Sequence, residues 1–429
     1  MKLPRKGRSL SLFSSQLILI SYLFKWLLIC LIIGSIAGTA SAGFLLSLQW
    51  ATEWREQHFW IICLLPLAGL LIGLIYHYYG QDVSRGNNQL LEEFHNPKNI
   101  IPFKMAPMIW LSTVLTHLVG GSAGREGTAV QMGGSLADQL THLFKFKPRD
   151  RKVILIAGIA AGFASVFGTP LAGTIFGLEV MVIGQLSYTA ILPSLLSAVI
   201  ADYMCRAWNV GHTHYHIDLI PALNSINILW TILAGIVFGI VAMLFSWLMH
   251  KIADCFKTIV NYAPLRPLLG GAVLVMVIAA IQWLVPAYST RYLGLGVPVI
   301  VESFKQQQLF VDFAAKILFT AFTLGAGFKG GEVTPLFFIG ATLGSALSLI
   351  IPLPVGLLAG MGFVSVFAGA ANTPLACIVM GLELFGIEAG VFIALACIVA
   401  FLFSGNSGIY TSQRIGSAKH ILLYRYLRK

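Results

Sequence analysis

The stretch TPLAGTIFGLE at positions 169–179 occurs again, in altered form, as TPLACIVMGLE at positions 373–383. Both copies follow the pattern T-P-L-A-x-x-x-x-G-L-E, so seven of the eleven positions are identical. A match of this length within one chain is typical of an internal duplication. The fold is therefore expected to contain two structurally related halves.

A glycine-rich stretch lies upstream of each copy of the repeat. GGSAGREGTAVQMGGSLA begins at Gly120, and GAGFKGGEVTPLFFIGATLGSA begins at Gly325. Each contains a glutamate two residues before a threonine, at Glu126 and at Glu332. These glutamates precede the proline of the following repeat copy by 44 and 42 residues. Two features thus recur in the same order at nearly the same separation, which extends the duplication over most of each half.

The composition excludes an ordinary soluble enzyme. Of the 429 residues, 57% are hydrophobic and only 10% are charged, whereas a soluble domain carries about 25% charged residues. Seven long stretches lack Asp, Glu, Lys and Arg, namely 26–52, 153–178, 180–201, 219–250, 267–290, 333–382 and 389–413. Because one helical span of a bilayer takes roughly 20 apolar residues, the chain has room for about ten to twelve hydrophobic helices. The predicted class is an all-α polytopic membrane protein.

Basic residues predict which parts of the chain face the cytoplasm. MKLPRKGRS precedes an apolar run over 17–42, which exceeds the roughly 7 to 15 residues of a signal-peptide core, so we expect an uncleaved first span. Basic clusters at 145–152 and 414–429 favour the cytoplasmic side. The predicted organisation is a cytoplasmic segment at 1–16 followed by one transmembrane domain at 17–429, with no soluble C-terminal domain.

Within this transmembrane domain, repeat one is expected at about 85–210, repeat two at about 295–412 and a C-terminal helix at about 412–429. The formal net charge of the whole chain is +11. In a chain this apolar, such an excess indicates loops that face anionic lipid. The lipid bilayer is therefore the expected partner, and nucleic acid is not.

The cysteines and histidines are only weak indications of disulfides or of a metal site. The six cysteines lie within or beside apolar segments without C-x-x-C spacing, which is typical of small core residues. His212, His214 and His216 alternate in GHTHYHID, so an extended segment would place three imidazoles on one face, as a metal site does. A loop also holds exposed histidines without any metal. We expect no catalytic metal and no cofactor.

The two glycine-rich stretches predict helices that begin inside the membrane. Apolar, helix-like segments start near Ala129 and at Pro335, and a proline suits the first turn of a helix. The free N–H groups and positive dipole end of such a helix attract an anion. Glu126 and Glu332 stand at these starts, and an ionisable group at such depth predicts a function. Repeated halves with interrupted helices favour a secondary transporter, although the glycines also suit close helix packing.

Two enzyme motifs occur in the same stretches. Positions 120–124 match G-x-S-x-G, with Ser122 as the nucleophile and His117 nearby, but the strand-turn-helix context of this motif is missing. Positions 325–330 match G-x-G-x-x-G without an alternating strand or an acidic residue at the right distance. A membrane-embedded serine hydrolase remains the alternative from a different functional class.

Three motifs together resemble the CLC family of chloride channels and transporters. GREGTAVQMG at 124–133 resembles the GREGP signature, and GGEVTP at 330–335 falls where the family usually has G-x-F-x-P. GNSGIYTSQ at 405–413 resembles the segment with the central tyrosine. The resemblance covers essentially the whole membrane chain. It implies a homodimer with one pathway per subunit, each subunit made of two inverted repeats whose broken helices meet at a mid-membrane anion site.

Departures from the CLC pattern resemble one branch of the family. Asn87 stands at the serine position of G-S-G-I-P, and Thr128 replaces the proline of the GREGP signature. Glu332 and Val333 replace the usual apolar residue and phenylalanine. Together these residues look like the fluoride/proton antiporters, which export toxic fluoride from bacterial cells. The implied substrates are fluoride and protons, and the implied location is the bacterial inner membrane, with both termini cytoplasmic.

The resemblance also implies roles for single residues. Glu126 matches the gating glutamate, Tyr410 matches the tyrosine whose hydroxyl faces the anion, and Glu332 matches the extra glutamate of the fluoride branch. Asn87 would supply an amide N–H donor. The other residues implied around the anion are Val333 and Thr334, the helix N-terminal Gly127 and Thr128, and Arg125 as electrostatic support.

Fluoride/proton antiport is the predicted function, with a chloride/proton antiporter or a passive anion channel of the same fold as alternatives. The inner proton glutamate of chloride/proton antiporters aligns with Val180, so no separate inner proton route is expected there. Glu179 and Glu383, which the repeat copies share, are expected to end helices or to satisfy buried donors. A carboxylate beside a bound anion couples proton binding to anion occupancy, because each charge changes the affinity for the other.

Overall fold

The computed structural model describes residues 12–420, most of which are helical. Within this part of the chain, the α-helices are α1 Leu12–Gln57, α2 Leu65–Tyr78, α3 Asn87–His95, α4 Met105–Leu118, α5 Glu126–Leu143, α6 Pro148–Phe167, α7 Pro170–Glu179, α8 Ile191–Ala207, α9 Ser225–Ile259, α10 Leu265–Leu284, α11 Val297–Ser303, α12 Phe310–Gly325, α13 Val333–Leu347, α14 Val355–Ala371, α15 Pro374–Phe385 and α16 Gly390–Phe403. Short 3-10 helices lie at Phe59–Leu64, Gln81–Val83, Tyr188–Ala190 and Pro286–Tyr288, and the strands are β1 Val182–Ile183 and β2 Arg414–Ile415.

The fold contains both long and short apolar helices. Five helical segments of the described chain are long and apolar enough to cross a membrane: Leu19–Gln57, Phe59–Tyr78, Tyr188–Ala207, Ser225–Ile259 and Leu265–Leu284. Five shorter apolar helices are α4, α13, α14, α15 and α16. At about 1.5 Å per residue, such short helices reach only part of the roughly 30 Å hydrocarbon core. The chain is a polytopic all-α membrane protein that contains broken helices, as predicted.

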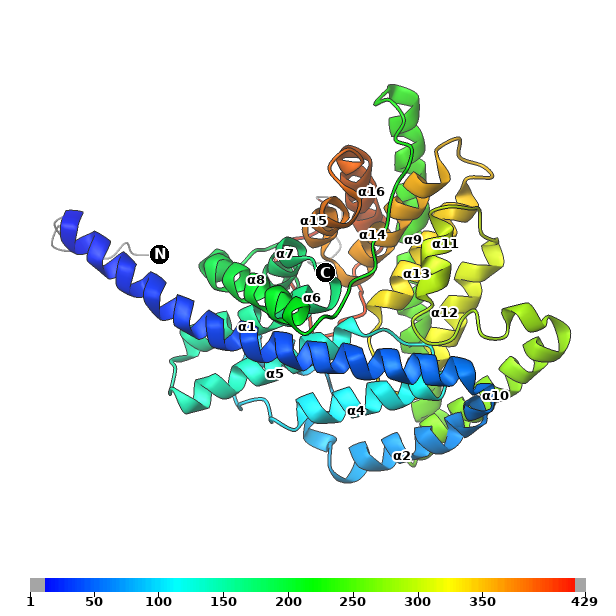
Figure 1. The fold of residues 1–429 in the computed structure, drawn as a ribbon, viewed down its shortest axis with the longest axis horizontal. Coiled ribbons are helices and arrows are strands. Elements are labelled where there is room, and N and C mark those ends of the chain that lie inside the picture. Colours follow the sequence, from blue (N-terminus) through cyan, green and yellow to red (C-terminus); the bar gives the residue numbers. More distant parts are fainter. Residues whose placement is uncertain (1–11, 421–429) are drawn as a thin grey trace, which may run out of the picture.

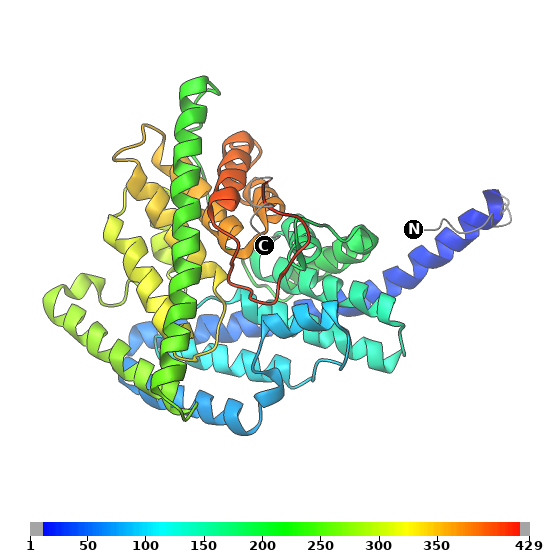
Figure 2. The same ribbon diagram turned by 180° about the vertical axis from the view of Figure 1, so that it is seen from behind.

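One long helix covers each half of the molecule. Helix α1 packs against α4, α5, α6 and α8 of the first half, whereas α9 packs against α12, α13, α14 and α16 of the second. Figure 1 shows α1 running along the first-half helices toward α10. Figure 2 shows α9 from behind as the long upright helix beside the second half.

The repeated motif forms a reciprocal contact between the halves. The carboxylate of Glu383, in the last turn of α15, accepts hydrogen bonds of 3.0 and 2.7 Å from two backbone N–H groups in the first turn of α7. Glu179, at the end of α7, accepts bonds of 3.1 and 2.9 Å from the first turn of α15. Each helix therefore ends beside the start of the other, so the repeats are inverted. The expectation that both glutamates satisfy buried donors is confirmed.

Glycines also bring neighbouring helices close together within each repeat, at equivalent places in the two repeats. A β-carbon at Gly133 in α5 would lie 2.3 Å from the carbonyl oxygen of Gly158 in α6. A β-carbon at Gly340 in α13 would lie 2.0 Å from the carbonyl oxygen of Gly362 in α14. Since no side chain fits either contact, the helices pack backbone to backbone. Close packing and helix interruption, the two predicted uses of the glycines, both occur.

The two ends of the described chain differ from the predictions. Helix α1 starts at Leu12, before the predicted first span, and residues 1–11 of the predicted N-terminal segment lie outside the described residues. The predicted C-terminal helix is wrong for 412–420, where the chain forms bends and strand β2, which pairs in parallel with β1. The side-chain amide of Gln413 donates to the carbonyl oxygens of Val180 (3.0 Å) and Ala371 (2.9 Å). These contacts hold the segment extended, and residues 421–429 lie outside the described part.

Candidate functional site

The loops that precede α5 and α13 are joined by a two-bond bridge. The backbone nitrogen of Gly124 donates to the carbonyl oxygen of Gly331 at 2.6 Å, and the nitrogen of Gly331 donates to the oxygen of Gly124 at 2.8 Å. Helix α5 starts at Glu126 and α13 at Val333, directly after this bridge. The free N–H groups of the two helices therefore converge on one small region. The predicted meeting of broken helices is present.

The carboxylate of Glu126 lies at the N-terminus of the opposite helix, α13. The side chain is fully buried, and its Oε2 accepts hydrogen bonds from the backbone nitrogens of Thr334 (3.0 Å) and Arg125 (3.1 Å). The hydroxyl of Thr334 donates to Oε1, and the Arg125 Nε lies 3.6 Å from the same oxygen. Negative charge is favoured at a helix N-terminus. The Glu126 carboxylate thus occupies a position that would also suit a free anion.

Three other predicted residues line a small cavity beside this helix start. The cavity has a volume of about 160 Å³, and Asn87, Glu332 and Tyr410 are among its lining residues. A β-carbon at Gly127 would lie 3.0 Å from the Asn87 Nδ2 and 3.5 Å from the Glu332 Oε2. The Oδ1 of Asn87, the Oε2 of Glu332 and the hydroxyl of Tyr410 are buried without a hydrogen-bond partner. Such atoms are rare in proteins, and their convergence suits a small polar ligand.

Two residues predicted around the anion serve the framework of the site. The Val333 side chain is buried, with 1% of its surface exposed. The hydroxyl of Thr128 is bonded at 2.7 Å to the hydroxyl of Thr113 in α4, so it is directed toward the neighbouring helix. The structure therefore brings Glu126, Glu332 and Asn87 together around the helix starts, whereas the side chain of Thr128 anchors α5.

A family model matches most of the chain. Residues 68–405 match the profile of the voltage-gated chloride channels. The chain belongs to the voltage-gated chloride channel family. The match covers repeat one, the region between the repeats and most of repeat two.

Among relatives within the voltage-gated chloride channel family, a protein of Pseudomonas syringae pv. tomato described as a chloride/fluoride channel protein is 52% identical to this chain. The alignment covers 94% of this chain and 90% of that protein. The H⁺/Cl⁻ exchange transporter ClcA of Vibrio parahaemolyticus is 26% identical, over 84% of this chain and 82% of the transporter.

Solved structures of the family share the fold. A CLC-type fluoride/proton antiporter superposes with a TM-score of 0.87 at 34% identity, covering 92% of this chain and 98% of that one. A slow cyanobacterial Cl⁻/H⁺ antiporter superposes with a TM-score of 0.78 at 21% identity, covering 94% and 98%. The latter likeness concerns the fold alone.

Sequence reasoning missed a lysine in this member of the voltage-gated chloride channel family. Lys329 lines the 160 Å³ cavity and also an adjoining cavity of about 490 Å³. Its Nζ lies 4.2 Å from the centroid of the Tyr76 ring, a cation–π contact. Lys329 is the single basic residue of its glycine-rich stretch and precedes Glu332 by three positions. A lone basic residue so close to Glu332 is the sequence feature that could have identified Lys329 as part of the site.

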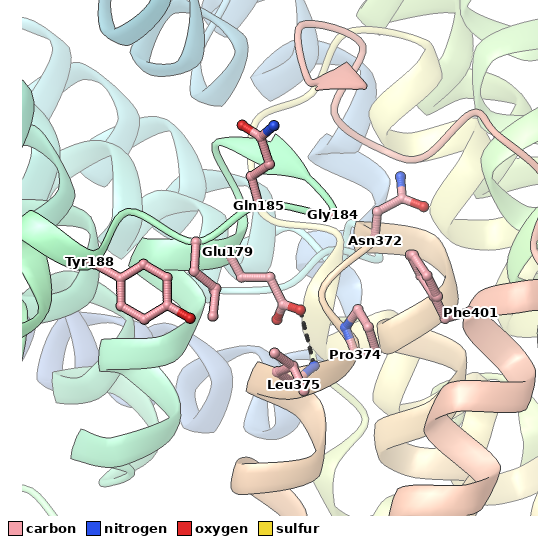
Figure 3. A pocket seen from close by; sticks show the side chains of 9 residues that line it. Glu179, Gly184, Gln185, Tyr188, Asn372, Pro374, Leu375 and Phe401 are labelled. Atoms are coloured by element: carbon pink, nitrogen blue, oxygen red, sulfur yellow. Dashed lines mark hydrogen bonds between the residues drawn. The ribbon is translucent and has the colours of Figure 1, made fainter. Parts of the chain in front are cut away.

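A larger cavity, of about 530 Å³, lies at the contact between α7 and α15. Figure 3 shows the Glu179 side chain directed at the start of α15, with a hydrogen bond to the backbone nitrogen of Leu375 and with Tyr188 and Phe401 nearby. Val180, at the position of the inner proton glutamate, is 3% exposed. The carboxylate of the preceding residue, Glu179, therefore satisfies a helix N-terminus.

The residues of the serine hydrolase alternative are engaged elsewhere. Both ring nitrogens of His117 contact carbonyl oxygens, those of Thr113 (2.8 Å) and Ala123 (3.0 Å). The Ser122 hydroxyl lies 3.0 Å from the hydroxyl of Thr320 and is fully buried. Because neither His117 nitrogen faces the serine, the pair lacks the contact that activates a nucleophile.

The histidine motif does not assemble a metal site. Within residues 12–420, no three His, Cys, Asp or Glu side chains are grouped as metal ligands. The His216 side chain is 82% exposed, and its Nε2 lies 3.5 Å from Asp218 Oδ1. The His212 side chain is 10% exposed. The His212 imidazole is thus largely enclosed, whereas His214 and His216 are exposed.

Proposed function

We propose that this protein exchanges fluoride for protons across a bacterial membrane and thereby exports fluoride. The observation that carries the proposal is the carboxylate of Glu126 at the N-terminus of α13, where it accepts bonds from the backbone nitrogen and hydroxyl of Thr334. Fluoride is a small anion that accepts hydrogen bonds from the same donors. The Glu126 carboxylate and fluoride therefore compete for the same position at the N-terminus of α13.

The surroundings of this place suit fluoride. Fluoride is strongly hydrated, so a site must replace its water with close hydrogen-bond donors. The hydroxyl of Tyr410 is buried without a partner, and the Asn87 amide lies beside Gly127 at the start of α5. The cavity they line is small, about 160 Å³. In the proposed site, these groups and the backbone N–H groups of Gly127, Val333 and Thr334 replace the hydration shell.

Two carboxylates provide the coupling to protons. Protonation removes the charge that holds Glu126 at the start of α13, so the neutral side chain leaves and fluoride takes its place. Glu332 lies beside Gly127 and lines the cavity, so it is placed to exchange a proton with an anion there. Arg125, 3.6 Å from the Glu126 carboxylate, stabilises negative charge at either stage. Proton binding and fluoride release then alternate at one site.

Basic residues and the strand pairing support one orientation of the protein in the membrane. We assign both termini to the cytoplasm of a bacterial cell, on the positive-inside tendency. The basic segment 414–419 pairs with β1, which directly precedes the span Tyr188–Ala207. This span therefore starts at the cytoplasmic face, and the linker after Ala207 lies at the outer face. By resemblance to the family, the functional unit is a homodimer in the inner membrane.

Reconstitution into liposomes tests the proposal. Under an outward fluoride gradient, we expect fluoride efflux to drive proton uptake against a pH gradient, with chloride moving far more slowly. Glu126→Gln should abolish the proton flux, whereas Glu388→Gln at an exposed position should not. Fluoride efflux without proton movement would instead establish a passive channel. Equal chloride flux would establish a chloride/proton antiporter.

A further inference from the structure

A cavity of about 330 Å³ lies beneath the linker that joins α8 to α9. Its lining includes polar side chains from three parts of the chain: Arg206 of α8, Glu383 of α15, and His212 and His214 of the linker. The cavity is separate from the one that contains Asn87 and Tyr410. In the proposed orientation it lies at the outer face, on the side from which protons enter.

The imidazole of His212 lines this cavity and lacks a well-defined hydrogen-bond partner. Its side chain is 90% buried, and neither ring nitrogen makes a hydrogen bond of good geometry, although the carbonyl of Val166 lies near the ring. A β-carbon at Gly168 would lie 2.6 Å from the ring Cδ2, so the ring packs directly on the end of α6. Burying an unpaired imidazole is costly, which points to a role other than stability.

Charged side chains lie near both His212 and Glu126, the proposed gating glutamate. The His212 Nε2 lies 3.9 Å from Asp202 Oδ1, and Asp202 in turn is paired with Arg206 at 3.0 Å. Arg125 lies within electrostatic range of the imidazole, and its own Nε is buried without a hydrogen bond, 3.6 Å from the Glu126 carboxylate. The groups facing His212 are therefore Asp202 and Arg206 from α8, Arg125 from the start of α5 and, across the cavity, Glu383 from α15.

These surroundings keep His212 neutral at physiological pH. Burial, assisted by the positive charge of Arg125, lowers the pKa of His212 to about 4, while Asp202 opposes the shift. A neutral imidazole has one nitrogen that accepts a proton and one that donates a proton. It can therefore receive a proton on one side and release one on the other without remaining charged.

We propose that His212 relays protons between this cavity and the carboxylate of Glu126. A proton from the cavity binds the unprotonated ring nitrogen, and the imidazolium releases the proton of its other nitrogen toward Glu126. The ring is then neutral in its other tautomer, and tautomer exchange or rotation of the ring returns it to the starting state. Asp202 stabilises the transient imidazolium, and Arg125 prevents it from persisting. The inference rests on the proposed function, because it concerns the proton that enters in exchange for fluoride.

The test compares His212→Ala with His216→Ala in liposomes. His216 belongs to the same HTHYH motif but is exposed, so its variant is the matched control. Fluoride-driven proton uptake is measured across a range of pH, equal on both sides, with and without added imidazole. We expect His212→Ala to slow proton uptake by about tenfold or more, as loss of a positioned proton-transfer group does. Added imidazole should restore the rate of His212→Ala, because the cavity next to the missing ring is large enough to admit it.

Each outcome distinguishes the relay from its alternatives. Rescue by imidazole, together with no effect of His216→Ala and no rescue of Glu126→Gln, supports the relay. A His212→Ala rate that is unchanged, or reduced with the wild-type pH profile and no rescue, overturns it and leaves a packing role. If the wild-type protein itself moves no protons with fluoride, the proposed function fails, and that result is visible before any variant is compared.

Discussion

A β-carbon at Gly331 would lie 2.7 Å from the backbone nitrogen of Gly127, and one at Gly127 would lie 3.0 Å from the α-carbon of Gly331. The two repeats thus touch through bare backbone at the place where both broken helices start. Because close-packed interiors leave no room for an added methyl group, a side chain at either position must push the helix starts apart. The geometry around Glu126 and Thr334 depends on this contact.

Gly331→Ala should therefore damage both folding and transport. We expect the free energy of unfolding to fall by about 1–3 kcal/mol, as for other overpacked sites. Fluoride flux should fall with it, because the backbone nitrogen of Thr334 moves away from Glu126. Thermal unfolding in detergent and fluoride efflux from liposomes measure the two effects. Gly211→Ala is the folding control, since an added carbon there meets no atom within 4 Å; equal melting temperatures for both variants would contradict the prediction.

The hydroxyl pair formed by Thr113 and Thr128, 2.7 Å apart, predicts non-additive effects on stability. Thr128→Val leaves the hydroxyl of Thr113 buried without a partner, which costs about 1–3 kcal/mol. Thr113→Val should cost a similar amount, and the double variant should cost less than the sum of the two. Melting temperatures of all three variants give the coupling. The ratio of fluoride to chloride flux should stay at its wild-type value; a change in Thr128→Val alone would show that this hydroxyl reaches the anion.

Much of the fold was predictable because the duplication leaves a local signature. The repeated TPLA motif, the two glycine-rich stretches and the depth of Glu126 and Glu332 together predicted two related halves with helix starts at an anion site, and the family resemblance added that the halves are inverted. Glycine and proline determine where a membrane helix can begin, and this information lies within a few residues of the break. Such features can be read from sequence without knowledge of the packing.

The features that escaped prediction depend on distant partners. The segment 412–420 is extended because Gln413 binds backbone carbonyls at Val180 and Ala371, which no local pattern indicates. Spacing alone left the orientation of the repeats open, and the reciprocal contacts of Glu179 with α15 and of Glu383 with α7 resolve it. In each case the deciding contact joins residues far apart in the chain.

The position of Lys329 predicts an electrostatic effect on fluoride entry. Its ammonium group lines both the site cavity and the adjoining larger cavity, so it raises the local concentration of anions. We expect Lys329→Met to lower fluoride flux by about tenfold at low ionic strength, within the range found for charge-steered association. The deficit should shrink as potassium gluconate is added, because screening shortens the reach of the charge from about 30 Å at 0.01 M to about 10 Å at 0.1 M.

Lys257→Met is the matched control for Lys329. Lys257 also lines the larger cavity, but its side chain is 60% exposed and it is paired with Asp254 at 3.0 Å. Its charge is already balanced and screened by solvent, so removing it should change flux much less. Equal deficits in the two variants would mean that the overall positive charge of the cavity matters and that the position of Lys329 does not.

Glu179 offers a test of the proton route that does not involve the anion site. Its carboxylate accepts hydrogen bonds from two backbone N–H groups at the start of α15. The side chain of its neighbour Val180 cannot carry a proton. Glu179→Gln removes a negative charge from a helix N-terminus, so we expect a stability loss of about 1 kcal/mol. The number of protons moved per fluoride should stay unchanged, in contrast to Glu126→Gln. Fluoride and proton flux measured in parallel give this ratio. A loss of coupling in Glu179→Gln would contradict the prediction and place a second proton pathway along the contact between α7 and α15.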